Sequence, residues 1–534
     1  MKRCLTNLGW CSVLTAGCVA QAGGVLYGQQ AVSLAVVPAK MQKIGSVDPR
    51  FAAYNIEMVE VTGGRFWKPY KDDAPAAKLP AQQNQNQQVG ENAALFQYRA
   101  PIDLTDGRLR KLAAALGPSY VRVSGSWANS TYFQNDDNPA LREPPKGFRG
   151  ILTRAEWKGV VDFSRAVDAK IVTSVAISPG VRDASGVWTP DQAKAFFDYT
   201  RSIGGSIAAT EFMNEPTFPG PGGAPAGYDA DAFARDIRVF EPFLRKELPH
   251  TVFLGPGSVG EGVSLMPAGA PSGMQMKLLT TADLMKVTPP VFDAFSYHFY
   301  GTVSHRCMGN LRLDQALTAD WLDRTDTVEA FYAAIRDRYL PGKPMWLTET
   351  GEAACGGDRL AKQFVDTFRF LNQYGTLSQK GVQVILHNTL ASSDYGLLDE
   401  DTHEPRPDYW AMLLWKRTMG NVVLDPGTPK SEALRIYAHC DKGKKGGVTL
   451  LALNTDTQNE RKLAVPVAGE RFTLTAPELT STTVLLNGVE LKAASDGSVP
   501  VLNGQPFRAG MVELAPASIT FLTLARARNK SCEQ

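Results

Sequence analysis

The sequence predicts an α/β protein in which a (β/α)8 TIM barrel is joined to an accessory antiparallel β-sandwich. Two observations predict the barrel. Eight short runs of β-branched or aromatic residues recur between Phe51 and Asn388, and helical patterns separate most of them. A third observation predicts the sandwich: after Trp410 and its helix, the chain holds many short strand-like runs and almost no helical period.

The eight strand candidates begin at Phe51, Ser119, Lys170, Ala209, His250, Phe292, Pro344 and Val382. Among the intervening segments, residues 231–248 and 326–340 show the clearest 3.6-residue spacing of apolar side chains, which is typical of helices. The alternative is an open, doubly wound sheet. No glycine-rich phosphate loop follows the first strand, which disfavours the dinucleotide-binding form of that fold.

These patterns divide the chain into a barrel over residues 50–418 and a sandwich over residues 419–534. An early apolar run, AVSLAVVP, could add a strand to the sandwich, so residues 28–48 are expected to join it. Residues 80–94 are rich in Gln and Asn, and we expect an exposed loop there.

Residues 1–22 have the layout of a secretory signal peptide. A basic start is followed by an uncharged apolar stretch and the small-x-small run Ala20-Gln21-Ala22. Cys18 after LTAG resembles a lipoprotein signal, but Thr15 stands where a large aliphatic residue is preferred. We therefore expect export to the periplasm or the extracellular space, with lipid anchoring as the less favoured alternative.

Charge and composition exclude several classes of partner. Without residues 1–22, Lys and Arg fall from 56 to 54, which equals the 54 Asp and Glu. A formally neutral chain has no overall field to attract nucleic acid. Beyond residue 22, no apolar run reaches the roughly 20 residues that span a bilayer.

Four cysteines remain after the signal, enough for two disulfides or for four free thiols.

Polar residues interrupt the predicted barrel strands where chemistry is expected, at their carboxyl ends. The fourth strand is expected to end in Asn214-Glu215, the seventh in Thr348-Glu349-Thr350 and the sixth in Tyr297-His298-Phe299-Tyr300. Two carboxylates facing each other across a barrel mouth suit glycoside hydrolysis, in which one acid protonates the leaving oxygen and the other attacks or activates water. Asn214 would be placed to hydrogen-bond a sugar hydroxyl, and Arg122, His298 and Tyr300 could hold the second glutamate in position. The first strand carries the further polar residues Asn55 and Glu57.

Other chemistries lack their motifs. No His, Cys and carboxylate cluster has metal-ligand spacing, so we expect neither a metal nor another cofactor. No Gly-x-Ser-x-Gly elbow is present, which disfavours a serine hydrolase. A single glutamate at a strand end is usually a solvated residue or a helix cap, so the hypothesis depends on the two glutamates agreeing with one mechanism.

Several segments resemble the heparanase and β-glucuronidase family of glycoside hydrolases, family 79 of clan A. FMNEP resembles its acid/base motif, and MWLTETGEAACGG resembles its nucleophile motif. YVRVSG and YHFY match segments of the second and sixth strands, and DYGLLDEDTHEPRPDYW matches the segment after the eighth strand, all in the family's order. The resemblance runs from about Phe51 to Trp410 and is most specific in the last third of the barrel.

The resemblance implies a retaining mechanism, with Glu215 as general acid/base and Glu349 as nucleophile. It implies that a glucuronic acid carboxylate is held by backbone amides near Gly356 and by Tyr395, and that Glu57 lies near sugar hydroxyls. The substrate expected is an oligo- or polysaccharide that contains glucuronic acid. The alternatives are a clan A enzyme for a neutral β-glycoside and a catalytically silent glycan-binding protein.

The family also uses a cysteine pair that ties its β-sandwich, which Cys440 and Cys532 match. Cys307 and Cys355 both fall in predicted loops at the barrel mouth, where a disulfide could brace the glycine-rich turn; the alternative is coincidence. Where many family members carry a tyrosine before the glycines, this chain has Ala354-Cys355. That departure bears on how the sugar carboxylate is recognised.

Overall fold

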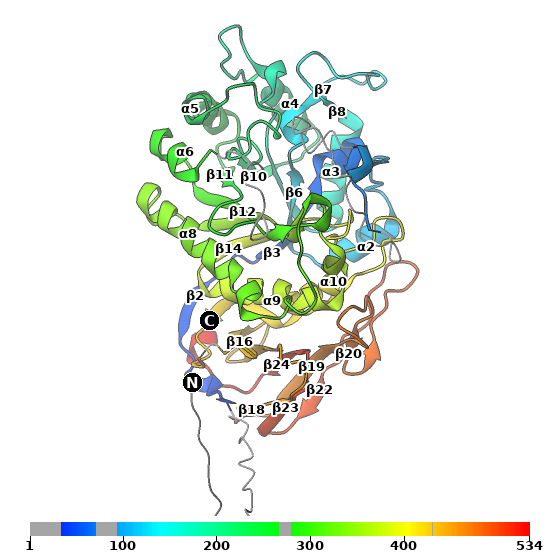
Figure 1. Ribbon diagram of the computed structural model, residues 1–534, viewed down its shortest axis with the longest axis vertical. Helices are drawn as coiled ribbons and strands as arrows, with labels where there is room; N and C mark the ends of the chain where they lie inside the picture. Colours follow the sequence, from blue (N-terminus) through cyan, green and yellow to red (C-terminus); the bar gives the residue numbers. More distant parts are fainter. Residues whose placement is uncertain (1–33, 71–92, 266–278, 430, 534) are drawn as a thin grey trace, which may run out of the picture. The chain divides into compact units, whose positions relative to one another are not determined.

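The computed structural model of the 534-residue chain describes residues 34–70, 93–265, 279–429 and 431–533. The predicted signal peptide lies outside the described residues, as does most of the Gln/Asn-rich segment. All eight predicted barrel strands are present and close into one barrel (Figure 1). The strands are β3 (Ala52–Glu57), β6 (Ser119–Ser124), β9 (Ala169–Thr173), β10 (Ile207–Glu211), β11 (Val252–Ser258), β12 (Ala294–Val303), β13 (Met345–Ala354) and β14 (Val382–His387).

Each barrel strand pairs in parallel with the next one along the chain, and β14 closes the ring against β3. The strands are buried along nearly their whole length, as expected for parallel strands covered on both faces. The predicted fold class, a (β/α)8 barrel with an accessory sheet domain, is confirmed, and the doubly wound alternative is wrong because the sheet has no open edge.

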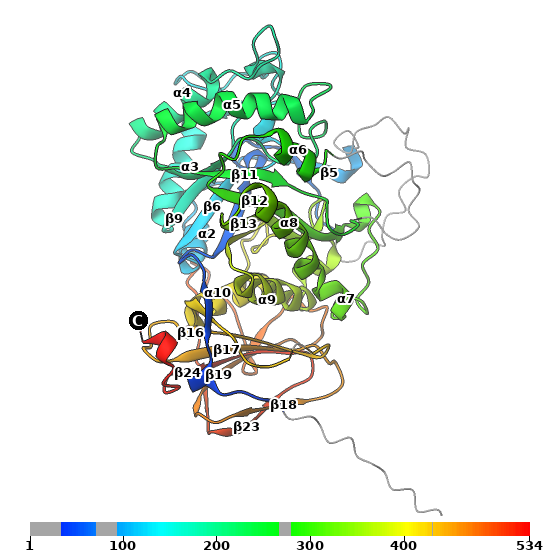
Figure 2. The same ribbon diagram turned by 90° about the vertical axis from the view of Figure 1, so that its left-hand side faces the viewer.

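Helices surround the barrel (Figure 2). They are α1 (Met58–Thr62), α2 (Gly107–Ala115), α3 (Arg154–Ala166), α4 (Asp191–Ser202), α5 (Ala230–Glu247), α6 (Thr281–Val287), α7 (Ala319–Leu322), α8 (Arg324–Tyr339), α9 (Phe364–Gln379) and α10 (Pro407–Thr418). Local sequence sets their starts: Asp229 accepts the Ala232 amide at the start of α5, and Thr153 with Glu156 forms a capping box on α3. Two short strand pairs project from the barrel, β4 (Gly64–Trp67) with β5 (Phe96–Arg99) and β7 (Thr131–Gln134) with β8 (Gly150–Thr153).

Two further sheets form the accessory module. The larger contains β2 (Lys43–Ser46), β15 (Met419–Leu424), β16 (Leu434–Asp441), β17 (Val448–Asn454), β19 (Gly469–Thr475), β20 (Leu485–Leu486), β21 (Val489–Glu490), β22 (Gln505–Phe507) and β24 (Ser518–Leu524). The smaller contains β1 (Leu34–Ala35), β18 (Arg461–Val465) and β23 (Gly510–Leu514). Apolar side chains from both sheets share one buried core, so they form a sandwich, to which the early strands β1 and β2 contribute.

No helix in the described ranges combines the length and apolar character needed to cross a membrane.

Candidate active site

The strands β6, β10, β12 and β13 bring the predicted catalytic residues into one cluster, and β12 and β13 continue beyond His298 and Glu349 to Val303 and Ala354, so these two strands do not end where the sequence predicted. His298 on β12 lies opposite Glu349 on β13 in the parallel register. Glu215 follows β10 after a short bend. The nearest nitrogen or oxygen atoms of Glu215, His298 and Glu349 all lie within 4.8 Å of one another. The two glutamates are therefore close enough to act on one glycosidic bond.

Glu349 is held at both carboxylate oxygens. Arg122 donates from Nη1 to Oε2 at 2.8 Å, and Tyr300 donates from Oη to Oε1 at 2.7 Å. Burial and the nearby carboxylate of Glu349 raise the pKa of Tyr300 well above its ordinary value, so the phenol keeps its proton and remains a donor. Asn388 donates to Tyr300 Oη at 3.1 Å and fixes the phenol in turn. Charge-assisted hydrogen bonds of this kind orient a carboxylate strongly.

Glu215 occupies a different environment. His298 Nδ1 lies 3.0 Å from Glu215 Oε1, and His298 Nε2 lies 3.4 Å from Arg122 Nη2. Because a guanidinium can only donate, Nε2 is the acceptor, which leaves the proton on Nδ1 to be donated to Glu215. Burial raises the pKa of Glu215 above its ordinary value despite this bond, and the carboxylate of Glu349 adds to the rise. A carboxyl that retains its proton can serve as a general acid.

The backbone at Glu215 is itself unusual. Its φ is +52°, in the left-handed region that non-glycine residues rarely adopt. Its side chain is 17% exposed against 8% for Glu349, so Glu215 is the more accessible of the two acids. The preceding Asn214 is anchored by its backbone amide to Asn129 Oδ1 at 2.8 Å, while its side-chain oxygen accepts from Arg122 at 2.7 Å.

Arg122 also forms an ion pair with Glu211, a residue that the sequence analysis did not select. Glu211, the last residue of β10, is fully buried and accepts from Arg122 Nε and Nη2 at 3.0 and 2.9 Å. Thr348 donates to its other oxygen at 2.8 Å. Burial opposes ionisation of Glu211, but the Arg122 guanidinium holds its pKa below its ordinary value. The sequence does contain a signal for Glu211, because an ionisable residue inside an apolar strand run is costly to bury without a partner.

Glu57, at the end of β3, extends the carboxylate cluster. Burial raises its pKa well above the ordinary value, the carboxylate of Glu349 adds to the rise, and Arg122 opposes it. A Cβ placed on Gly125 would lie 1.5 Å from Glu57 Oε2, so only glycine leaves room for this carboxyl. Glu60 accepts the Glu57 backbone amide at 2.6 Å, and burial raises the pKa of Glu60 to about 7.

The glycine-rich turn after β13 lies beside the same cluster. Gly356 is buried, has a φ of +85°, and its carbonyl accepts from Ser393 Oγ at 2.9 Å. The Gly356 amide donates no hydrogen bond to another described residue. Tyr395 stacks on Tyr300 with ring centroids 6.5 Å apart and accepts a hydrogen bond from Asn388. A buried amide without a partner is costly, which suits a position that an anionic ligand completes.

The residues that sequence analysis singled out therefore gather at one end of the barrel. Asn55 is adjacent to the cluster, with its side chain donating to the Thr348 carbonyl at 3.3 Å. Two further residues of the site have no signal in the sequence: Asn388, which contacts both tyrosines, and Arg306, which donates to the Cys355 carbonyl at 2.7 Å. These two come from loops whose positions depend on the closed barrel.

Both cysteine pairs form disulfides. Cys440 and Cys532 link within the sandwich, as the family resemblance implied. Cys307 and Cys355 link the loops after β12 and β13. The second pairing, which the sequence left open between a brace and a coincidence, is a bond at the barrel mouth.

Glu215, His298 and Glu349 form the one group of potential metal ligands found among the described residues. They are far apart in the sequence, which is why spacing could not predict them as a group. Arg122 already donates to Glu349, and a cation between the three residues would stand beside this guanidinium. Repulsion between the two positive charges disfavours metal binding there.

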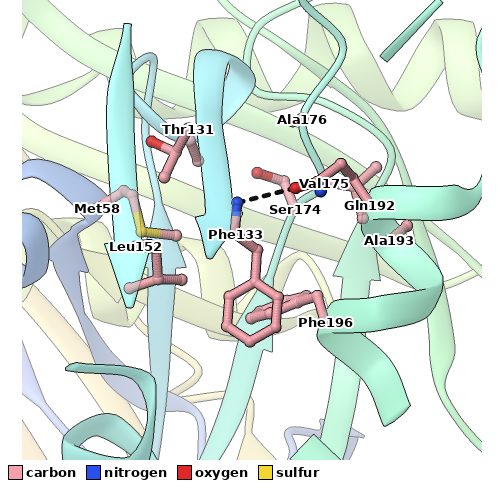
Figure 3. A pocket seen from close by; sticks show the side chains of 11 residues that line it. Met58, Thr131, Phe133, Leu152, Ser174, Val175, Ala176, Gln192, Ala193 and Phe196 are labelled. Atoms are coloured by element: carbon pink, nitrogen blue, oxygen red, sulfur yellow. Dashed lines mark hydrogen bonds between the residues drawn. The ribbon is translucent and has the colours of Figure 1, made fainter. Parts of the chain in front are cut away.

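Two cavities near the site do not contain the catalytic pair. Figure 3 shows the smaller, about 30 Å³, which is mainly apolar and where the Phe133 amide donates to Gln192 Oε1 at 2.9 Å. It has room for about one water molecule and none for a sugar. The larger, about 480 Å³, is bordered by Glu60, Arg99 and Glu400.

A parallel barrel with two closely spaced glutamates, one within β13 and one just after β10, in two different environments, defines the class: the protein is a glycoside hydrolase. The sequence model "Glycosyl hydrolase family 79, N-terminal domain" matches residues 92–375. The chain belongs to that family.

Relatives that align over most of their length support the same family. The chain is 27% identical to "Heparanase-like protein 1" of Arabidopsis thaliana, over 81% of this chain and 86% of the relative. It is 26% identical to "Hyaluronoglucuronidase" of Hirudo nipponia, over 84% of this chain and 95% of the relative. A solved structure of a 4-O-α-L-rhamnosyl-β-D-glucuronidase from Fusarium oxysporum aligns with a TM-score of 0.59 at 12% identity, covering 92% of this chain and all of that one; this similarity concerns the fold.

Proposed function

We propose that this protein is a retaining glycoside hydrolase that cleaves β-linked glucuronic acid in an oligo- or polysaccharide. Glu349 attacks the anomeric carbon and forms a glycosyl-enzyme, while Glu215 protonates the leaving oxygen. Glu215 then removes a proton from the water that releases the sugar. The observation that carries the proposal is the close pairing of two glutamates in opposed environments.

The separation of the glutamates supports retention over inversion. Inverting enzymes place their carboxyl groups about 6.5–9.5 Å apart to admit a water, whereas retaining enzymes place them about 5–5.5 Å apart. The nearest carboxylate oxygens of Glu215 and Glu349 lie within 4.8 Å. This separation is closer to that of retaining enzymes than to that of inverting enzymes.

The environments support the assignment of roles. Arg122 and Tyr300 hold both oxygens of Glu349, which suits an ionised nucleophile. Glu215, with its raised pKa and greater exposure, suits an acid that must carry a proton and reach the leaving group. The tautomer of His298 supports the same assignment of roles. His298 Nδ1 carries the proton and can donate it in a hydrogen bond to Glu215 after Glu215 has protonated the leaving oxygen and become a carboxylate.

Recognition of a uronic acid is supported by the turn at Gly356. Its unpartnered amide is a preorganised donor, and the ring of Tyr395 stacks on Tyr300, the tyrosine that holds Glu349. The name of the Hirudo nipponia relative is consistent with action on glucuronides. Glu57, protonated through its raised pKa, can donate a hydrogen bond to a sugar hydroxyl.

The test is hydrolysis of p-nitrophenyl β-glucuronide in parallel with the β-glucoside, β-galactoside and β-xyloside. Clear preference for the glucuronide supports the proposal. Activity on a neutral glycoside alone would keep the two glutamates but refute uronic acid recognition. Without activity on any of the four, the size of digested heparan sulfate separates an endo-acting enzyme from a silent binder.

Glu349→Ala tests catalysis directly. Loss of the nucleophile is expected to lower kcat by about 10³-fold or more, because no other described side chain can form the glycosyl-enzyme at that position. Equal activity of the variant and the parent would show that the nucleophile is assigned wrongly. A matched binding measurement on the inactive variant separates loss of chemistry from loss of folding.

We further propose that the protein is exported. Residues 1–22 support this through their signal-like layout, and two disulfides suit an oxidising compartment. Fractionation of producing cells, followed by N-terminal sequencing of the mature chain, tests the proposal. A chain that stays in the cytoplasm with residue 1 intact would refute it.

A further inference from the structure

The turn that follows β13 has a backbone conformation that its sequence does not favour. Cys355, Gly356 and Gly357 have φ values of +64°, +85° and +78°, three successive residues in the left-handed region. Glycine adopts this region freely, but cysteine does not. Cys355 is therefore the strained member of the turn, and something other than its intrinsic preference must hold it there.

Two sides of the barrel mouth hold this turn. From the loop after β14, Ser393 Oγ and the Asp394 amide donate to the Gly356 carbonyl at 2.9 and 3.0 Å. From the loop after β12, Arg306 Nη1 donates to the Cys355 carbonyl at 2.7 Å. The Cys307–Cys355 disulfide lies on the same side as Arg306, one residue along the chain. It is the covalent tether at the strained residue.

Residue 355 also controls the donor beside the catalytic cluster. Rotation about its backbone bonds turns the peptide plane between residues 355 and 356, which carries the Gly356 N–H. That amide has no acceptor among the described residues. A Cβ on the next residue, Gly357, would lie 2.7 Å from the Tyr395 amide nitrogen, so the turn is packed directly against Tyr395. If residue 355 relaxed to negative φ, the direction of the Gly356 amide would change.

We propose that the Cys307–Cys355 disulfide is a specificity element: it locks residue 355 in the left-handed conformation and thereby aims the Gly356 amide at the carboxylate of the sugar. The inference rests on the proposed glucuronide activity. It assigns a positioning role to two cysteines that touch neither catalytic glutamate. The uronic acid selectivity of this enzyme then depends on a covalent bond between two loops.

The experiment compares two pairs of variants. Cys307→Ser/Cys355→Ser removes the bond and leaves a residue that disfavours positive φ. Cys307→Ala/Cys355→Gly removes the same bond but supplies a residue that accepts it. Cys440→Ser/Cys532→Ser, which opens the disulfide of the sandwich, is the matched control. For each, kcat and KM are measured on the p-nitrophenyl β-glucuronide and β-glucoside, and Tm is recorded.

Loss of one well-aimed hydrogen bond to the carboxylate is expected to raise KM for the glucuronide about tenfold in the serine pair, with little change in kcat or in glucoside hydrolysis. The Cys355→Gly pair is expected to keep most of the parent's preference. The proposal is overturned if the serine pair keeps the parent's glucuronide-to-glucoside ratio, or if the control pair loses it equally.

Stability and specificity are separable in this design. If both barrel variants unfold below the assay temperature, or if both substrates lose kcat equally, the bond is a stability element and the specificity role is refuted. Failure of the proposed function is visible earlier, because the parent itself would show no preference for the glucuronide. A selective parent with an unchanged serine pair refutes the disulfide's role alone.

Discussion

The hydroxyl of Tyr300 provides a sharp test of how Glu349 is held. Tyr300→Phe removes the 2.7 Å hydrogen bond to Glu349 Oε1 and keeps the ring that stacks on Tyr395. Asn388 loses Tyr300 as an acceptor but retains the Tyr395 hydroxyl at 3.2 Å. The change is therefore confined to one oxygen atom and its hydrogen bonds.

A hydrogen bond to a charged group contributes about 1.5–3 kcal/mol, so kcat/KM for the glucuronide is expected to fall by about 10–100-fold. The physical reason is orientation: Arg122 still binds Oε2, but the carboxylate can rotate once Oε1 is free. The measurement is kcat/KM on p-nitrophenyl β-glucuronide, with Tm recorded to show that the variant is folded.

Tyr297 supplies the matched control, because it lies on the same strand, is also buried, and its hydroxyl has no hydrogen-bond partner among the described residues. Tyr297→Phe removes the same atom without touching Glu349 and is expected to leave kcat/KM within about twofold of the parent. The reasoning is refuted if the folded Tyr300 variant is as active as the parent, or if both phenylalanine variants lose activity equally.

Two further predictions concern protonation. The proposed acid must carry its proton, and the pKa of Glu215 is raised, so activity is expected to fall as pH rises through that pKa. Glu215→Gln should lower the rate by about 10²–10⁴-fold and abolish the alkaline limb of the pH-rate profile. A pH-rate profile of the variant that keeps the limb would contradict the assignment. Burial and the neighbouring Asp366 carboxylate raise the pKa of Asp408, a residue of α10, well above 3.8. The contribution of Asp408 to the free energy of unfolding is therefore full below pH 3.8 and is lost as pH rises through the pKa that Asp408 has in the folded state. Asp408→Asn should unfold at higher urea than the parent at pH 8, and a lower midpoint would count against a protonated Asp408.

Much of the barrel could be predicted because each strand contains a buried run that only a doubly covered strand explains. Glu215 and Glu349 stood out for the complementary reason, as charged residues at the ends of such runs. Glu211 obeys the same rule, but the apolar run continues through Phe212 and Met213, so the sequence does not mark Glu211 as the end of the strand. Its function depends on Arg122, 89 residues earlier, and no local pattern connects the two.

Other features depend on backbone geometry that sequence patterns do not encode. The left-handed conformation of Glu215 and the fit of Gly125 against Glu57 follow from how the loops close over the barrel. The Cys307–Cys355 pairing required knowing that the loops after β12 and β13 meet. Adjacent strands in a barrel place their following loops side by side, which made this bond plausible but did not decide it.

The distribution of charge at the barrel mouth explains why one arginine has so many partners. Glu57, Glu211, Glu215 and Glu349 all lie within electrostatic reach of Arg122, so full ionisation of the four would leave a large uncompensated negative charge. Arg122 forms ion pairs with Glu211 and Glu349, whereas Glu57 and Glu215 have raised pKa values. A fixed guanidinium thus gives the two proposed catalytic glutamates different environments: Glu349 accepts a hydrogen bond from Arg122 directly, whereas burial raises the pKa of Glu215, which suits the proposed general acid.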